Sequence, residues 1–155
     1  MAASFITYTK HAVAGSSSLL ATEGGAHIRN IVAEENIDNG SIVGLGDWIS
    51  MEKYKEGTAG AFTGTVLGKA ANGNYYVKVE SATNCWLVLT TPTIYEEYTT
   101  ACQHESNFYN EKGDIMRCYE LMPYDVFEIS AEGIDGTVTD GATLEVSNKK
   151  LTVKA

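Results

Sequence analysis

Apolar and polar residues alternate along several stretches of the chain, and residues 125–131 alternate most regularly. Every second position from Phe127 onward is apolar, and the positions between are polar. A period of two residues is typical of a half-buried β-strand. The preceding apolar run, residues 115–121, ends near Pro123, which has no backbone N–H to donate to a sheet and therefore belongs to a connection. Together with the polar turn at residues 110–114, this pattern predicts two strands and two turns, which we take as the centre of a β-rich domain.

Further strands are predicted wherever short apolar or alternating runs lie between turn residues. Asn-Gly pairs at residues 39–40 and 72–73 indicate tight turns. The apolar run 86–90 is expected to be covered on both faces, and the charged, glycine-bearing residues 52–60 are interpreted as a loop. The sequence predicts roughly eight to ten short strands closed into a barrel or a sandwich, because closure removes exposed strand edges. Outside the central pair, the predicted strands are residues 27–33, 41–45, 48–51, 62–67, 75–80, 86–90, 142–147 and 150–153.

Two stretches depart from the strand pattern. Residues 93–107 carry apolar side chains at three- and four-residue steps, which favours one short helix, with a long irregular loop as the alternative. Residues 1–26 are mostly small and polar, which suits an extended N-terminal arm better than a core element, with a frayed terminus as the alternative. Such an arm would reach roughly 80 Å when extended. We therefore divide the chain into this arm and a single β-rich domain, residues 27–155.

Composition and charge exclude some classes of protein. The chain has 155 residues, of which 44% are hydrophobic and 20% are charged, as in an ordinary folded domain with a substantial core. It carries 11 basic and 20 acidic residues, for a formal net charge of −9. A nucleic-acid-binding protein needs a basic face that releases counterions from phosphate, and no run of basic residues supplies one. We therefore expect no nucleic-acid partner.

Cysteine usage and hydropathy indicate where the protein is made. The three cysteines follow no metal-ligand spacing, and their odd number argues against a disulfide framework, so we expect reduced and mostly buried thiols. The first residues lack the basic start and unbroken apolar run of a signal peptide. No apolar run approaches the roughly 18 residues of a membrane span. The sequence predicts a soluble protein, made in a reducing cytoplasm, with no membrane partner.

No set of residues has the spacing of a catalytic or metal site. The three histidines are scattered and match no metal-binding motif. Glu96 and Glu97 are adjacent, so their carboxylates do not converge on one substrate. The aspartates and glycines of residues 133–141 lack the ordered spacing of a calcium loop. We expect no enzymatic activity, no metal and no cofactor, and a weaker alternative is an enzyme whose residues converge only in the fold.

The central region also resembles a known family. The pattern N-E-x-G-x-x-x-R-x-Y-x-L-x-x-x-D-x-F-x-I-S-A at residues 110–131 and the segment I-D-N-G-S-I-V at residues 37–43 are similar to small capsid decoration proteins (auxiliary head or cement proteins) of tailed bacteriophages. The similarity spans most of residues 35–131. It implies a compact, β-tulip-like barrel and carries no chemistry. One departure is Tyr124, where members of the family often place a glycine before the aspartate of the second turn.

The resemblance implies a virion structural protein. Such a protein, assembled in the host cytoplasm, binds the outer surface of the expanded capsid as a homotrimer and clamps neighbouring major capsid subunits. The arm is expected to add a strand to a sheet edge of the capsid, with contacts from Phe5, Ile6, Thr7, Tyr8 and Thr9. Aromatic residues outside the strand pattern are candidates for the subunit interface, with the alternative that half of them cap the barrel ends. These residues are Trp48, Tyr54, Tyr95, Tyr98, Phe108 and Tyr109.

A carbohydrate- or receptor-binding module of a virion fibre or surface adhesin is the alternative function. Exposed tryptophan and tyrosine side chains on a β-sandwich would stack on sugar faces. The two functions differ in the expected placement of the aromatic residues. A sugar-binding protein should gather Trp48, Tyr54 and Tyr95 in one exposed strip, whereas a cement protein should spread them along subunit contacts.

Overall fold

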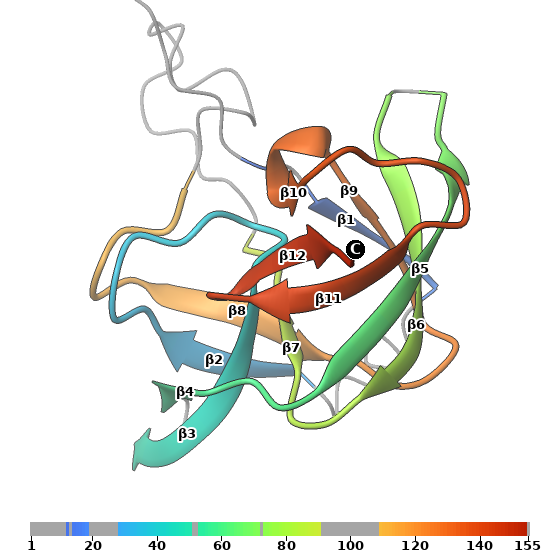
Figure 1. Ribbon diagram of the computed structural model, residues 1–155. Coiled ribbons are helices and arrows are strands. Elements are labelled where there is room, and N and C mark those ends of the chain that lie inside the picture. Colours follow the sequence, from blue (N-terminus) through green and yellow to red (C-terminus); the bar gives the residue numbers. More distant parts are fainter. Residues whose placement is uncertain are drawn as a thin grey trace, which may run out of the picture.

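The computed structural model describes residue 12 and residues 14–18, 28–50, 53–71, 73–90 and 109–154. Within these ranges the protein is mainly β, as predicted, with a closed five-stranded barrel and a seven-stranded sheet (Figure 1). The helical content of the described residues is one 3-10 turn, η3 (Ala131–Gly133). The predicted helix at residues 93–107 lies outside the described residues.

The barrel is formed by strands that are widely separated in sequence. In order around the barrel these are β2 (Ile28–Val32), β4 (Lys53–Gly57), β3 (Ile42–Ser50), β7 (Trp86–Val88) and β8 (Ile115–Glu120). β2 runs antiparallel to β8 and parallel to β4, and β3 runs antiparallel to both β4 and β7. The barrel encloses a compact apolar cluster made of Ile31, Ala33, Ile37, Val43, Trp86, Val88, Met116 and Cys118.

The second sheet is open and contains most of the hairpins. Its strands, in order, are β1 (Ala14–Ser18), β9 (Val126–Ile129), β6 (Tyr75–Ala82), β5 (Phe62–Lys69), β11 (Thr143–Ser147), β12 (Lys150–Val153) and β10 (Ile134–Asp135). The predicted hairpin at the C-terminal end is present as β11–β12. The predicted alternation of β9 is also confirmed, because Phe127 and Ile129 are fully buried and Glu128 between them is not.

Strands β3 and β7 join the two sheets because both of their faces are apolar. Val43 and Trp86 point into the barrel cluster, whereas their neighbours Ile42 and Leu87 pack into the larger core against the seven-stranded sheet. This arrangement confirms the prediction that the run at residues 86–90 is covered on both sides. Strands β3 and β7 therefore lie between two apolar clusters, one inside the barrel and one against the seven-stranded sheet.

Three predictions about strands were wrong. Residues 53–57 were interpreted as a loop but form β4, because alternate side chains, Tyr54 and Glu56, point to the barrel interior while Lys55 is exposed. The predicted strands 41–45 and 48–51 are one strand, β3, which continues through Gly46 by means of a bulge. Residues 14–18, assigned to the arm as unsuited to a core element, form edge strand β1 beside β9, since backbone pairing does not require large side chains.

The turn between β8 and β9 is formed as predicted around Pro123. The backbone N–H of Asp125 donates to the carbonyl of Met122 at 3.1 Å, and Tyr124 has a φ of 74°. Proline at the second position and positive φ at the third are the signature of a type II turn, in which the third residue is usually glycine. Tyr124 therefore adopts a conformation that is usually taken by glycine.

The two segments that carry the resemblance contact each other. Ile37 forms a bridge with Asn110, and the side chain of Asn110 donates to the Ile37 carbonyl at 3.0 Å and to Oδ1 of Asn39 at 3.2 Å. Asn39 in turn donates to the carbonyl of Thr90 at 2.8 Å. These buried amides fix the irregular segment before β3 against the chain that leads into β8.

Candidate interaction surfaces

The β3–β4 hairpin carries Trp48, one of the six aromatic residues that the sequence analysis named as candidates for an interface. Trp48 is 60% exposed, and its neighbour Ile49 is also exposed, so adjacent side chains on opposite faces of the strand are both apolar. Trp48 pairs across the hairpin with Tyr54, whose half-buried side chain packs against the barrel cluster. Figure 1 shows this end of β3 projecting beyond β2, away from the seven-stranded sheet.

A close backbone approach fixes the base of this hairpin. Gly44 pairs with Gly57, and a Cβ atom added to Gly44 would lie 2.3 Å from the carbonyl oxygen of Thr58. Two register shifts, on either side of Trp48, follow toward the tip. Because bulges bend a strand and increase its twist, they turn the exposed end of the hairpin away from the barrel wall.

The other predicted contact residues are only partly accounted for. Tyr109 is half-buried at the start of the chain that enters β8. Tyr95, Tyr98 and Phe108 lie outside the described residues, as do all five predicted arm contacts at residues 5–9. Of the three aromatic residues expected to gather in a sugar-binding strip, Trp48 and Tyr54 are direct cross-strand partners, and the third is not described.

Sequence patterns missed four other exposed apolar residues. Tyr124 is 77% exposed on the β8–β9 turn, Ile115 is 52% exposed at the start of β8, and Leu67 and Tyr76 lie on the outer face of the seven-stranded sheet. The strand register is what identifies them, because an apolar residue can be recognised as outward-facing only once the inward positions of its strand are known.

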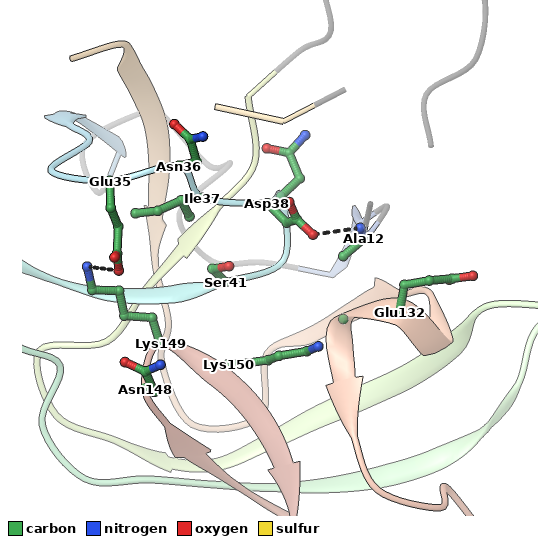
Figure 2. Close-up of a pocket in the computed structure, with 12 residues that line it drawn as sticks. Ala12, Glu35, Asn36, Ile37, Asp38, Ser41, Glu132, Asn148, Lys149 and Lys150 are labelled. Carbon is green, nitrogen blue, oxygen red and sulfur yellow. Dashed lines mark hydrogen bonds and ion pairs between the residues drawn. The ribbon is translucent and has the colours of Figure 1, made fainter. Parts of the chain in front are cut away.

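A cleft of about 320 Å³ separates the segment before β3 from the tip of the β11–β12 hairpin (Figure 2). On one side, the backbone N–H of Ala12 donates to Oδ2 of Asp38 at 3.1 Å. On the other, Lys149 Nζ lies 2.8 Å from Oε1 of Glu35, and the Lys149 carbonyl accepts the backbone N–H of Ile42 at 2.8 Å. Loop, hairpin and N-terminal segment therefore meet around one polar depression.

Lys149 also contacts a buried carboxylate. The side chain of Glu56 is only 2% exposed, and its Oε2 accepts the backbone N–H of Glu34 at 3.0 Å. Its Oε1 lies 2.7 Å from Lys149 Nζ, which is close enough for an ion pair although the contact lacks the direction of a hydrogen bond. A second cavity, of about 400 Å³, lies on this side of Lys149.

The electrostatics of this cluster indicate a structural role. Burial alone would lower the pKa of Lys149, but its contacts with Glu35 and Glu56 outweigh burial and raise the pKa above its ordinary value. The same hydrogen bond and charge hold the pKa of Glu35 below its ordinary value. A catalytic lysine needs a lowered pKa to act as a base or nucleophile, so Lys149 is tuned in the opposite direction.

The thiols are also unsuited to catalysis. Cys85 and Cys118 are free and buried, as the sequence predicted for these two. Burial raises the pKa of both thiols, and the charge of Glu56 raises that of Cys118 further. The thiolate is the reactive form, so neither residue is an activated nucleophile.

Neither a metal-binding group nor a membrane-spanning helix is found in the described residues, and the chain matches no known protein that it was compared with. Among the described residues, no group of three or more His, Cys, Asp or Glu side chains is arranged to hold a metal ion. No helix in the described ranges is long and apolar enough to cross a membrane. Comparisons with family models, with curated proteins and with solved structures found no match to this chain.

Proposed function

We propose that this chain is a virion structural protein that binds the outer surface of an expanded phage capsid and stabilises it by bridging neighbouring major capsid subunits. The observation that carries the proposal is the projecting β3–β4 hairpin with its exposed Trp48 and Ile49. The resemblance of residues 37–43 and 110–131 to capsid decoration proteins gives the class of partner. Homotrimer formation and location on the capsid exterior belong to the same proposal.

The hairpin suits a protein anchor because its two ends differ in rigidity and exposure. Its base is fixed by the close approach of Gly44 to Thr58, and its outer half presents a large aromatic side chain to solvent. Tryptophan is among the residues that contribute most to binding when it enters a pocket on a partner.

Co-sedimentation with capsids tests the function directly. Purified protein is mixed with expanded capsid shells that lack it, and the bound fraction is measured in the pellet. We expect saturable binding near one chain per major capsid subunit, and light scattering of the free protein gives its oligomeric state. Absence of pelleting by protein that is folded by circular dichroism would refute the proposal.

The proposed contact of the arm with the capsid is tested by a deletion that leaves strand β1 in place. Because β1 pairs with β9 and Ala12 is buried, removing all of residues 2–26 would expose an edge of the seven-stranded sheet. Deletion of residues 2–10 leaves β1 intact and removes the expected contacts Phe5, Ile6, Thr7, Tyr8 and Thr9. Weaker capsid binding by a variant with an unchanged melting temperature is expected, and full binding would exclude the arm as a contact.

Carbohydrate binding is a second candidate, favoured by the cross-strand pair of Trp48 and Tyr54. The exposed ring of Trp48 would be the platform on which a sugar face stacks, since Tyr54 is half-buried against the barrel cluster. A glycan array probed with the wild type and with Trp48→Ala tests this function. Binding to defined glycans that is lost in the variant would favour it, and no binding to any glycan would exclude the platform.

A further inference from the structure

One outer face of the barrel is basic, whereas the chain as a whole is acidic. Outward positions on β8 are Ile115 and Arg117, which pair with Val32 and Asn30 of β2. Val32 pairs on its other side with Lys55 of β4, and alternation places Lys53 on the same face. These strands therefore present three basic residues and no acidic residue outward, in a chain with 20 acidic and 11 basic residues. We call the outward side chains of Asn30, Val32, Lys53, Lys55, Ile115 and Arg117 the basic face.

The cations of the basic face are not neutralised by the part of the chain that the structure describes. Within those ranges no carboxylate forms an ion pair with Lys53, Lys55 or Arg117, and the guanidinium of Arg117 lies 6.0 Å from the ring of Tyr119. Elsewhere, three lysines are ion-paired with neighbouring carboxylates: Lys78, Lys149 and Lys150.

Acidic residues near the basic face lie in the connections at its edge. Asp114 precedes β8, and its Oδ2 accepts the backbone N–H of Glu111 at 3.0 Å, which ties that carboxylate to its own turn. Glu56 belongs to β4 but points to the opposite side, where it is buried beside Lys149. The charges at the outward positions of these three strands are therefore those of Lys53, Lys55 and Arg117.

Two apolar side chains beside the basic residues of the face indicate the kind of partner. Ile115 is exposed at one end of a row that continues through Val32 to Lys55. Apolar side chains beside basic residues are typical of protein interfaces, in which arginine is enriched. A nucleic-acid partner would need a larger basic surface than three cations in a chain with a formal net charge of −9.

We propose that the basic face docks onto a carboxylate-rich protein surface, with Lys53, Lys55 and Arg117 opposite its carboxylates and Ile115 and Val32 in apolar contact. The face is continuous with the projecting hairpin, because Lys53 pairs with Ser50 of β3. The hairpin and the basic face would thus engage one partner together. Only the identification of that partner as the capsid surface rests on the proposed function.

A pair of charge reversals with a matched control tests the docking. Lys55→Glu/Arg117→Glu reverses two exposed cations on the face, and Lys69→Glu/Lys154→Glu reverses two exposed cations outside it with the same change in net charge. Each protein is measured on capsid shells and on immobilised poly-L-glutamate over a range of salt concentrations. We expect the first variant to lose at least about tenfold in affinity at low salt, with the control within about twofold of the wild type.

The two probes separate failure of the docking face from failure of the proposed function. If the wild type does not bind shells but binds poly-L-glutamate through Lys55 and Arg117, the docking proposal is supported and the capsid-binding function is refuted. If both variants bind every probe equally, or if neither probe retains the wild type, the face is refuted. Tighter binding of the wild type to duplex DNA than to poly-L-glutamate would also overturn it, in favour of a nucleic-acid partner.

Discussion

The two hairpins near the barrel end differ in how their outer halves are held. The β11–β12 hairpin has a polar tip, Asn148 and Lys149, and is fastened to the barrel by the Lys149 carbonyl and by the ion pair of its side chain with Glu56. The β3–β4 hairpin presents Trp48 and Ile49, and among the described residues the strand pairing of β3 beyond Leu45 is with β4 alone. The polar tip is thus fastened by the contacts of Lys149 within the chain, although Asn148 is exposed, whereas the apolar end of the β3–β4 hairpin has no such contacts among the described residues.

The β3–β4 hairpin departs from the usual expectation that large apolar side chains face the core. Lys149 has a positive φ of 67° and sits beside a buried carboxylate, so it is committed to the fold. Trp48 has no comparable partner in the described part of the chain, and together with Ile49 it leaves exposed apolar surface at the hairpin end, a feature of interaction sites when it forms a patch. The difference separates a hairpin held by the fold, the structural hairpin, from the hairpin that we propose contacts a partner, the binding hairpin.

The largest effect is expected at the base of the binding hairpin. Gly44→Ala would place a Cβ atom 2.3 Å from the Thr58 carbonyl oxygen. Neither atom can move away by a side-chain rotation, because the oxygen belongs to the backbone and the Cβ is fixed to it, so the two strands must separate. We expect a loss of at least about 3 kcal/mol in the free energy of unfolding, measured by urea denaturation. Gly68→Ala is the matched control, because no atom lies within 4 Å of its added Cβ. Its change should stay within about 1 kcal/mol and favour the folded state. Equal losses in the two variants would contradict the close approach.

Loss of the lysine that fastens the structural hairpin should have the next largest effect. Lys149→Met leaves the buried Glu56 carboxylate without its cation, and we expect a loss of about 1–3 kcal/mol in unfolding free energy. Lys150→Met, which removes only the exposed ion pair with Asp135, should cost less than about 1 kcal/mol. Combining Lys149→Met with Glu56→Gln should recover part of the loss, because the buried charge is then removed. Similar losses for the two lysines would show that Glu56 does not depend on Lys149.

Truncation of the exposed tryptophan should separate binding from stability. Trp48→Ala removes a side chain that is 60% exposed, so the unfolding free energy should change by less than about 1 kcal/mol. Capsid binding, measured by co-sedimentation, should weaken at least about tenfold if Trp48 is the anchor. Leu67→Ala, at a 51% exposed position on the seven-stranded sheet, is the control and should bind as the wild type does. Unchanged binding in both variants would exclude the hairpin as the contact.

The sequence was sufficient for elements with a strong local signal. Period two identified β9, and the Pro123 turn and the β11–β12 hairpin followed from their turn residues. It was insufficient for β1, whose small side chains carry no pattern, and for β4, whose inward positions include the charged Glu56. That glutamate is buried beside Lys149, which lies far along the chain, and it also accepts the backbone N–H of Glu34. Trp48 was identified as a candidate contact residue because it is aromatic. Ile115 and the basic face could not be identified from the sequence, because the strand register of β2, β4 and β8 decides which side chains point outward.

The β8–β9 turn combines features of both hairpins and should respond only mildly. Tyr124 has a positive φ, as Lys149 does, and is exposed, as Trp48 is. Tyr124→Gly relieves the backbone strain, so we expect the unfolding free energy to rise by about 0.5–1 kcal/mol, read from the urea midpoint. Asn148→Gly, at a φ of 51°, should gain less, because asparagine tolerates this conformation better than tyrosine. A loss of stability in Tyr124→Gly would mean that contacts of the ring, including that of the Lys78 ammonium 5.1 Å from its centre, outweigh the strain.

The smallest effect is a dependence of the structural hairpin on pH at both extremes. The pKa of Glu35 is lowered in the folded protein, so its contribution is present above the ordinary value of 4.5 and is lost as pH falls through the folded value. The pKa of Lys149 is raised, so its contribution is present below the ordinary value of 10.5 and is lost as pH rises through the folded value. The stability difference between wild type and Lys149→Met should therefore be constant near neutral pH and shrink beyond both limits. The difference between wild type and Trp48→Ala should show neither change, since no ionisable partner holds that side chain within the described ranges. A pH-independent Lys149 difference across the whole range would mean that the hairpin is fastened by its backbone hydrogen bond to Ile42 alone.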